Sequence, residues 1–281
     1  LAELIRRFVP MRFEAFEEYA QEHEQVGVDE LRAAGSASIG IFERWHPAGY
    51  VEHCAIAAAA GVDPVDLFTA GNMTDMRDIA LLSGPGPDRP DAEGCSAVLV
   101  PPHLSATGEL ICGQTWDLNP QDVDYVVAVH RKPTDALETW SVSVCGCPSL
   151  VGMNAAGLTI GTTNVKTWGA KAGVGYMNIL HRMMEARTAQ EAINIATQAP
   201  RSGAHIYWAA DATQAIEIEA NPSEAFRRDT SSKAICRTNH CLNPENTAIE
   251  WQEPSSSSIA RLTRLERVSN AGGVDPQAMI E

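Results

Sequence analysis

Cys95 is the first residue whose position suggests chemistry, because it follows a segment rich in glycine and proline and precedes a predicted strand. Placement alone is typical of a buried structural cysteine, since free cysteines are commonly buried. Gly94 changes that interpretation, because glycine removes the side chain that would obstruct attack of the thiol on its own preceding carbonyl. An N→S acyl shift followed by hydrolysis would cut the chain between Gly94 and Cys95. Cys95 would then carry a thiol and a free α-amine with a pKa of about 8, which can act as general base for the nucleophile.

Two polar motifs later in the chain contain the residue types that such a nucleophile needs. Residues 113–117 read Gly-Gln-Thr-Trp-Asp, and residues 238–240 read Thr-Asn-His. Asp117 can hold the amine of Cys95 through a charge-assisted hydrogen bond, and Asn239 can donate a hydrogen bond to a developing oxyanion. Taken singly, each is typical of a turn residue. Together with Gly94 and Cys95 they form a candidate catalytic set.

The other cysteines do not have metal-ligand spacing. Cys145 and Cys147 are separated by one residue, whereas zinc-binding pairs have wider gaps, and no second pair answers them. Adjacent histidine and cysteine residues, such as His240-Cys241, would point to opposite faces of a strand. We therefore expect no metal and no cofactor. An odd cysteine count, seven in all, without a visible secretory signal predicts reduced thiols in a cytoplasmic protein.

The composition predicts an acidic, globular chain. It has 281 residues and a net charge of −15, with 44% hydrophobic and 20% charged residues, which is enough to bury a core. The acidic balance disfavours nucleic acids and anionic membranes, because both select basic patches, and no apolar stretch reaches the length of a membrane span. Residues 1–94 carry a net charge of −10 and residues 95–281 a net charge of −5. Because both parts are acidic, apolar helix faces are expected to hold them together.

The elements that would position the candidate residues change in type at the same place. Residues 1–80 are predicted to be mainly helical, with an amphipathic helix from Leu1, a second helix over 47–60 and a short helix that begins at Asp63-Pro64. Residues 83–94, with three prolines and three glycines, are predicted to form an exposed, flexible connection.

From Cys95 onward the sequence is typical of strands that alternate with a few helices. The predicted strands are 96–100 with its hairpin partner 110–116, then 125–130, 140–145, a strand–turn–strand over 151–164, 205–210 and 215–219. The predicted helices are 176–185, 188–199 and a last one from 259. This order predicts an α+β fold in which helices cover stacked antiparallel sheets, an αββα arrangement.

The ordered set of motifs resembles the acyl-coenzyme A:isopenicillin N acyltransferase family, the cysteine-type N-terminal nucleophile hydrolases of the C45 peptidase group. The resemblance runs from near residue 40 to near residue 264. The matching motifs are Asn72 and Asp75, Gly94-Cys95-Ser96, residues 113–117, residues 152–158, residues 238–240, and Ser257-Ser258 with Arg261 and Arg264.

This resemblance implies a four-layer αββα sandwich of the N-terminal nucleophile hydrolase type with a helical N-terminal prosegment. Residues 1–94 would form the small chain and residues 95–281 the large catalytic chain, which together make one composite domain after self-cleavage. Cys95 would be the nucleophile that forms an acyl-enzyme thioester, Asp117 a partner in the site, and Asn239 the oxyanion donor.

The family also has a later Asp-His and Ser-Ile-Cys stretch, which does not occur in the sequence up to Glu281. No late catalytic arginine is therefore assigned, and Arg261 and Arg264 are interpreted as helix-surface or structural residues.

The expected function is that of a self-processing amidohydrolase or acyltransferase that acts on a small amide or N-acyl substrate, with its own cleaved prosegment as partner. The acyl acceptor, whether water, an amine or coenzyme A, stays open, as does the oligomeric state. One alternative is an inactive binding or scaffold protein on the same fold, which the combined presence of the candidate residues disfavours. Another is a conventional cysteine peptidase that pairs its thiol with His130, His205 or His240, for which the sequence has no local signature.

Overall fold

The computed structural model describes residues 1–22, 26–84, 94–230 and 232–277. Residues 85–93, which hold most of the predicted exposed connection, lie outside these ranges. The helices are α1 (Ala2–Glu22), α2 (Val28–Trp45), α3 (Pro47–Ala60), α4 (Pro64–Gly71), α5 (Met73–Leu81), α6 (Tyr176–Met183), α7 (Ala189–Gln198), α8 (Pro244–Thr247) and α9 (Ser256–Ser269). The strands are β1 (Cys95–Val100), β2 (Ile111–Trp116), β3 (Val126–Arg131), β4 (Thr139–Val144), β5 (Val151–Asn154), β6 (Thr159–Asn164), β7 (His205–Ala210), β8 (Ala215–Ala220), β9 (Ala225–Asp229) and β10 (Ile235–Arg237).

Local signals set the ends of the N-terminal helices where the sequence predicts them. Helix α3 begins at Pro47 and is closed by Gly61, which has a left-handed φ of 68°. Helix α4 is capped by Asp63, whose Oδ1 accepts hydrogen bonds from the backbone N–H groups of Val65 at 2.8 Å and Asp66 at 3.2 Å. The predicted helical character of residues 1–80 is therefore confirmed.

The strands form two antiparallel sheets. The smaller sheet has the order β10-β1-β2, and the larger has the order β3-β4-β5-β6-β7-β8-β9. In the smaller sheet Cys95 pairs with Trp116, and Ala97 pairs with Gln114 on one side and Arg237 on the other. The predicted hairpin of residues 96–100 with 110–116 is thus confirmed.

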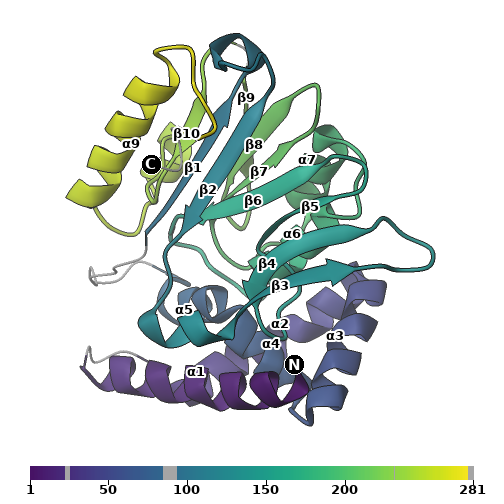
Figure 1. The fold of residues 1–281 in the computed structure, drawn as a ribbon. Helices are drawn as coiled ribbons and strands as arrows, with labels where there is room; N and C mark the ends of the chain where they lie inside the picture. Colours follow the sequence, from purple (N-terminus) through teal and green to yellow (C-terminus); the bar gives the residue numbers. More distant parts are fainter. Residues whose placement is uncertain (23–25, 85–93, 231, 278–281) are drawn as a thin grey trace.

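The two sheets pack face to face through the odd-numbered side chains of β1. Ala97 and Leu99 contact Trp208, Ala210 and Ala215 of the larger sheet. The even-numbered side chains of β1 point the other way and pack against α9, while α6 and α7 cover the opposite face of the larger sheet. The predicted α+β fold, a four-layer αββα sandwich, is confirmed, and Figure 1 shows these layers.

A buried ion network ties the two sheets together next to the candidate site. Arg237 of β10 donates hydrogen bonds to Glu217 at 2.6 Å and to Glu219 at 2.7 Å, both on β8. Burial opposes the negative charge of Glu217, but the adjacent Arg237 guanidinium lowers its pKa. The same Glu219 carboxylate accepts the backbone N–H groups of Leu242 and Asn243. The network therefore fixes both ends of the loop that carries Asn239.

The N-terminal helices lie along one end of the sandwich, as Figure 1 shows. Apolar side chains join them to the sheets, for example Phe8, whose ring centroid is 5.4 Å from that of Tyr125. Ion pairs also join the N-terminal helices to the sheets, although residues 1–94 and 95–281 are both net acidic. Arg12 of α1 lies 2.6 Å from Asp122, and Glu52 of α3 lies 3.0 Å from Arg131. The expectation of purely apolar association is thus incomplete.

Among the described residues, no single helix is long and apolar enough to cross a bilayer. Helices α3 and α4 would pass as a pair by length and composition, but the chain bends by 108° at the break between them.

Candidate active site

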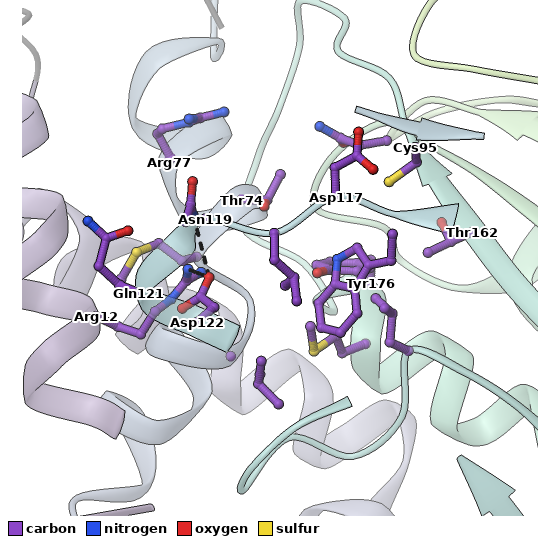
Figure 2. A pocket seen from close by; sticks show the side chains of 18 of the residues that line it. Arg12, Thr74, Arg77, Cys95, Asp117, Asn119, Gln121, Asp122, Thr162 and Tyr176 are labelled. Carbon is purple, nitrogen blue, oxygen red and sulfur yellow. Dashed lines mark hydrogen bonds and ion pairs between the residues drawn. The ribbon is translucent and has the colours of Figure 1, made fainter. Parts of the chain in front are cut away.

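Cys95 lies at one end of a cavity of about 480 Å³. As the first residue of β1 it shares the face of Ala97, which is turned toward the larger sheet, so its side chain points between the sheets. Trp116 and Gln114 lie on the same face of the neighbouring strand and also line the cavity. In Figure 2, Cys95, Asp117 and Thr162 gather at one end of this cavity, and Arg12 and Asp122 lie at the other.

Gly94 and Asp117 are in direct contact across the small sheet. The backbone N–H of Asp117 donates a hydrogen bond of 3.0 Å to the carbonyl oxygen of Gly94. A Cβ atom placed on Gly94 would lie 2.1 Å from Oδ2 of Asp117. The carbonyl that precedes Cys95 is therefore already bound by a donor, and the carboxylate lies against the same residue.

Asn239 holds the backbone nitrogen of Cys95. The N–H of Cys95 donates to Oδ1 of Asn239 at 2.6 Å, and Nδ2 of Asn239 donates to the carbonyl oxygen of Asn164 at 3.0 Å. These two partners fix the orientation of the side-chain amide, because reversing it would oppose donor to donor and acceptor to acceptor. The side chain thus presents its oxygen, and not its NH2 group, to Cys95.

Arg261 reaches the same place from the helical layer, which the sequence interpretation missed. Its Nη1 donates to the carbonyl oxygen of Cys95 and, at 2.8 Å, to Oγ of Ser96, and its Nη2 donates to Oδ1 of Asn239 at 3.0 Å. Arg261 is therefore not a simple helix-surface residue, because it binds Cys95 and Asn239 directly. Arg264, three residues further along α9, is exposed. The signal that could have identified Arg261 is its place in the family-like motif that begins at Ser257-Ser258 and also contains Arg264.

The start of α9 aims Arg261 at the site. Ser255 caps the helix by accepting the N–H of Ser258 at 3.1 Å, and Oγ of Ser258 in turn accepts the N–H of Asn239 at 3.0 Å. The cap and the Asn239 loop are therefore held to each other, which sets the position of the first turn of α9 and of the arginine that follows it.

The three histidines of the alternative interpretation lie in different environments. His130 stacks on Trp140 with ring centroids 4.8 Å apart, on the outer strands. His240 lies 2.7 Å from Oγ of Ser258, and burial lowers its pKa. His205 lines the cavity, with its Nε2 2.7 Å from Oδ1 of Asp75.

The remaining thiols are free, and those that are deeply buried are poorly suited to nucleophilic chemistry. Burial raises the pKa of Cys145 to about 12 and that of Cys236 to about 11, so the reactive thiolate is scarce at neutral pH. Within the described ranges, no group of three or more His, Cys, Asp or Glu side chains is arranged to hold a metal ion.

The geometry brings together the three residues singled out from the sequence. Cys95 offers a thiol, Asp117 a carboxylate beside the preceding glycine, and Asn239 an acceptor for the nitrogen of Cys95. Arg261 adds a positive charge on the outer side of the strand. Such a set has the residue types that nucleophilic attack on a carbonyl requires.

One family of known proteins matches a large part of the chain. The acyl-coenzyme A:6-aminopenicillanic acid acyl-transferase family model matches residues 105–281, a segment that begins after Cys95 and includes Asp117, Asn239 and Arg261. No curated protein sequence matches the chain.

Two solved structures are similar over part of the chain. The C2A mutant of the conjugated bile acid hydrolase from Clostridium perfringens is 10% identical, over 66% of this chain and 73% of that chain, with a TM-score of 0.43. Penicillin V acylase from Agrobacterium tumefaciens is 13% identical, over 52% of this chain and 44% of that chain, with a TM-score of 0.28.

Proposed function

The chain belongs to the acyl-coenzyme A:6-aminopenicillanic acid acyl-transferase family, and from this membership we propose that it is a self-processing cysteine amidohydrolase or acyltransferase. The nucleophile is Cys95, freed as an N-terminal residue by cleavage after Gly94. Residues 1–94 then form a small chain that stays bound to the catalytic chain of residues 95–281. The observation that carries the proposal is that both sides of this one peptide bond are held: the Gly94 carbonyl by Asp117, and the Cys95 nitrogen by Asn239.

Self-cleavage proceeds by attack of the Cys95 thiol on the Gly94 carbonyl. The C–S bond forms, the thiol proton passes by way of the Asp117 carboxylate to the departing nitrogen, and the C–N bond breaks to leave a thioester. Water then hydrolyses the thioester to a Gly94 carboxylate and a free thiol. The N–H of Asp117, 3.0 Å from the Gly94 oxygen, is placed to stabilise the negative charge that develops there.

In turnover the released α-amine of Cys95 acts as the base. It takes the thiol proton as sulfur attacks the substrate carbonyl, and it returns that proton to the leaving amine. Because Oδ1 of Asn239 accepts from the same nitrogen at 2.6 Å in the intact chain, it can go on accepting from the amine. This geometry favours a positioning role for Asn239 over the oxyanion donation that the resemblance implies.

The substrate is a small amide or N-acyl compound that fits the cavity of about 480 Å³. Both proposed chains contribute to its walls, since Arg12 and Phe16 come from α1, and Trp116, Val144 and Met177 come from the catalytic part. The apolar members suit an acyl group, and the polar end near Arg12 suits the other half of the substrate. Water, an amine or a thioester partner can serve as acyl acceptor or donor in this scheme.

A conventional cysteine peptidase is the second candidate, because His205 lines the same cavity and is held by Asp75 at 2.7 Å, as in a catalytic triad. The two candidates differ in what they require of the Gly94–Cys95 bond. A triad enzyme works with Cys95 inside a continuous chain, whereas the proposed mechanism needs a free amine.

Intact-mass spectrometry under denaturing conditions distinguishes these functions. The proposal expects two fragments divided between Gly94 and Cys95, Cys95→Ala protein that remains one chain, and no acylation of Cys95→Ala by an activated ester. Full-length wild-type chain that nevertheless turns over substrate by a Cys95-dependent and His205-dependent route would support the triad enzyme instead. Wild-type protein with neither cleavage nor Cys95 acylation would identify a non-catalytic binding protein.

A further inference from the structure

The charged side chains that the N-terminal part contributes to the wall of the Cys95 cavity are positive. Residues 1–94 contain 17 acidic and seven basic residues. Among the described residues of this part, the charged side chains that line the cavity are Arg12 and Arg77, and no acidic side chain lines it. The charge on this wall is thus opposite to that of the part that builds it, which favours an anionic group on the ligand.

Helix geometry turns the acidic side chains of α1 away from the cavity. Four residues of α1 line the cavity at the spacing of one helix face: Arg12, Ala15, Phe16 and Tyr19. Glu14 and Glu18 lie on the opposite side of the helix and are exposed. On α5 the acidic side chains Asp75 and Asp78 are buried, whereas Arg77 lines the cavity.

Arg12 has donors left for a ligand. Its Nη1 donates to Oδ2 of Asp122 at 2.6 Å, and this carboxylate is its only hydrogen-bond partner among the residues that the structure describes. A guanidinium carries five N–H donors in a planar fork that matches the geometry of a carboxylate. The Arg12 side chain is 16% exposed and lines the cavity, so a carboxylate in the cavity can reach it. Arg77 adds a second positive charge to the same wall.

The position of the arginines indicates which half of an amide substrate they contact. Figure 2 shows Arg12 and Arg77 on the side of the cavity away from Cys95. A substrate whose carbonyl carbon lies at the Cys95 thiol therefore extends one half toward the arginines. Apolar side chains such as Val144 and Met177 also line the cavity and suit an acyl chain. The charged group is thus expected on the amine half.

We infer that Arg12, with Arg77 as a second positive charge, binds a carboxylate on the amine half of the substrate, so that the substrates are N-acyl amino acids; this inference rests on the proposed function. When Cys95 is acylated, the C–S bond forms, the amide C–N bond breaks, and the amino acid leaves with the proton taken from the thiol. Arg12 exchanges no proton in this step. It is a specificity residue that the small chain supplies to the large one.

Two amides with the same acyl group test the inference on processed wild-type protein with both chains present. N-hexanoylglycine carries a carboxylate, and N-hexanoylglycinamide replaces it with a neutral group of similar shape. Release of hexanoate measures cleavage of either amide. We expect kcat/KM to be about 10- to 100-fold higher for N-hexanoylglycine, as for a charge-assisted hydrogen bond. Equal values, or a preference for the glycinamide, would overturn the inference.

Two variants separate ligand binding from the structural role of the ion pair, because Arg12→Gln and Asp122→Asn break the same pair. Arg12→Gln should lose most of the preference for the carboxylate, and Asp122→Asn should keep or increase it. Because the preference is a ratio of two kcat/KM values within one protein, a general loss of activity does not change it. An equal loss of preference in both variants would contradict carboxylate binding by Arg12.

Two further arginine variants test whether position in the cavity matters. Arg77→Gln should lower the preference by a smaller factor than Arg12→Gln. Arg32→Gln is the matched control, because Arg32 pairs with Asp66 at 2.9 Å on the surface and does not line the cavity. This control should keep the wild-type preference, and a loss as large as that of Arg12→Gln would overturn the assignment to the cavity wall.

Other substrates distinguish the inference from the proposed function. N-propyl adipamate carries its carboxylate on the acyl half, and a higher kcat/KM for it than for N-hexanoylglycine would contradict the placement on the amine half. p-Nitrophenyl hexanoate acylates Cys95 without any amine half. Wild-type protein that reacts with this ester but does not distinguish the two glycine amides would reject the inference alone. Wild-type protein that is neither cleaved after Gly94 nor acylated by the ester would reject the proposed function.

Discussion

The carboxylate of Asp117 fills the space that any side chain at position 94 would need. A Cβ on Gly94 would lie 2.1 Å from Oδ2 and 3.2 Å from the carboxyl carbon of Asp117. Gly94 is not among the glycines that have a positive φ, so its backbone conformation does not itself require glycine. Glycine is needed here because a carboxylate lies against the peptide bond that we propose is cut.

Gly94→Ala is therefore expected to stop self-cleavage by pushing Asp117 away from the bond. The added methyl group cannot be accommodated without moving either the carboxylate or the β1 end of the chain, and a displacement of about 1 Å in a catalytic arrangement can cost about 100-fold in rate. Intact-mass analysis should find a single chain where wild type yields two.

The double variant Gly94→Ala/Asp117→Ala shows which of the two residues matters. The next contact of the added Cβ is with Cβ of Asp117 at 3.6 Å, an ordinary packing distance, so the clash is relieved. Continued absence of cleavage would show that the Asp117 carboxylate itself takes part. Cleavage at the wild-type rate in the double variant would contradict the proton-transfer role given to Asp117.

Arg261→Ala should slow acylation of Cys95 by about 10- to 100-fold, because charge-assisted hydrogen bonds are worth about 1.5–3 kcal/mol each. The guanidinium contacts the Cys95 carbonyl and Oδ1 of Asn239, so we expect it to position the proposed nucleophile. Arg264→Ala, on the exposed side of the same helix, is the matched control and should leave the rate unchanged.

The pH–rate profile distinguishes this positioning role from general destabilisation of α9. A guanidinium charge disfavours the protonated form of an amine near it. Removing Arg261 should therefore move the ascending limb of kcat/KM to higher pH, and Arg261→Lys should restore it. A slower variant whose profile keeps its wild-type position would indicate a structural effect only.

Asp75→Ala should loosen the hold of α5 on the catalytic part. Its buried carboxylate accepts the N–H of Tyr176 at 2.7 Å, Oγ–H of Ser202 at 2.9 Å and lies 2.7 Å from Nε2 of His205. Removing one partner of a buried charged network costs about 3–5 kcal/mol, which corresponds to a Tm lower by about 6–20 °C for a chain of this size.

Calorimetry of the processed protein measures this change, with Asp66→Ala as control. Asp66 pairs with Arg32 at 2.9 Å on the surface, where such pairs contribute about 0–1 kcal/mol. Equal destabilisation by both variants would show that the Asp75 network does not hold the two parts together.

Helix ends in the N-terminal part follow from short-range chemistry, which is why the sequence could predict them. Pro47, Gly61 and the Asp63 cap act within a few residues of themselves. Helix α2 was not predicted as a separate element because Gly35 weakens an isolated helix. In the fold that glycine is required, since a Cβ there would lie 1.9 Å from Oγ1 of Thr69 on α4.

Strands β9 and β10 were not predicted from the sequence either. Residues 225–229 read Ala-Phe-Arg-Arg-Asp, a polar edge strand, and β10 has only three residues. Both are fixed by their partners, β8 and β1, and not by their own periodicity. A pattern of alternating apolar residues cannot reveal a strand that is defined by what lies beside it.

The candidate site likewise contains some residues that the sequence can identify and others that only the fold brings together. Cys95, Asp117 and Asn239 could be selected because each carries a reactive or polar group within a recognisable motif. Arg261 reaches Cys95 across 166 residues of sequence, and Arg12 reaches Asp122 across 110. Those relationships depend on how the elements pack, so no spacing in the sequence encodes them.

Glu52 links the two parts in a manner that depends on pH. Its Oε2 lies 3.1 Å from Nε2 of His181, and its Oε1 accepts from Nε of Arg131 at 3.0 Å. The hydrogen bond with His181 and the nearby positive charges lower the pKa of Glu52 to about 2, against the cost of burial. Glu52 belongs to α3, and both partners lie in the proposed catalytic part.

Because the folded pKa of Glu52 is below its ordinary value of 4.5, the unfolded chain binds more protons between these two pH values, and stability rises with pH across the window. The contribution of Glu52 is thus complete above about pH 4.5 and is lost as pH falls toward 2.

Glu52→Gln should be less stable than wild type at pH 7, and the difference should shrink steadily from pH 5 to pH 2. Urea unfolding at each pH measures the difference, with the exposed Glu109→Gln as a control that stays parallel to wild type. A Glu52→Gln deficit of constant size from pH 7 to pH 2 would show that the neutral side chain merely packs less well, and that the charge of Glu52 does not help hold α3 to the catalytic part.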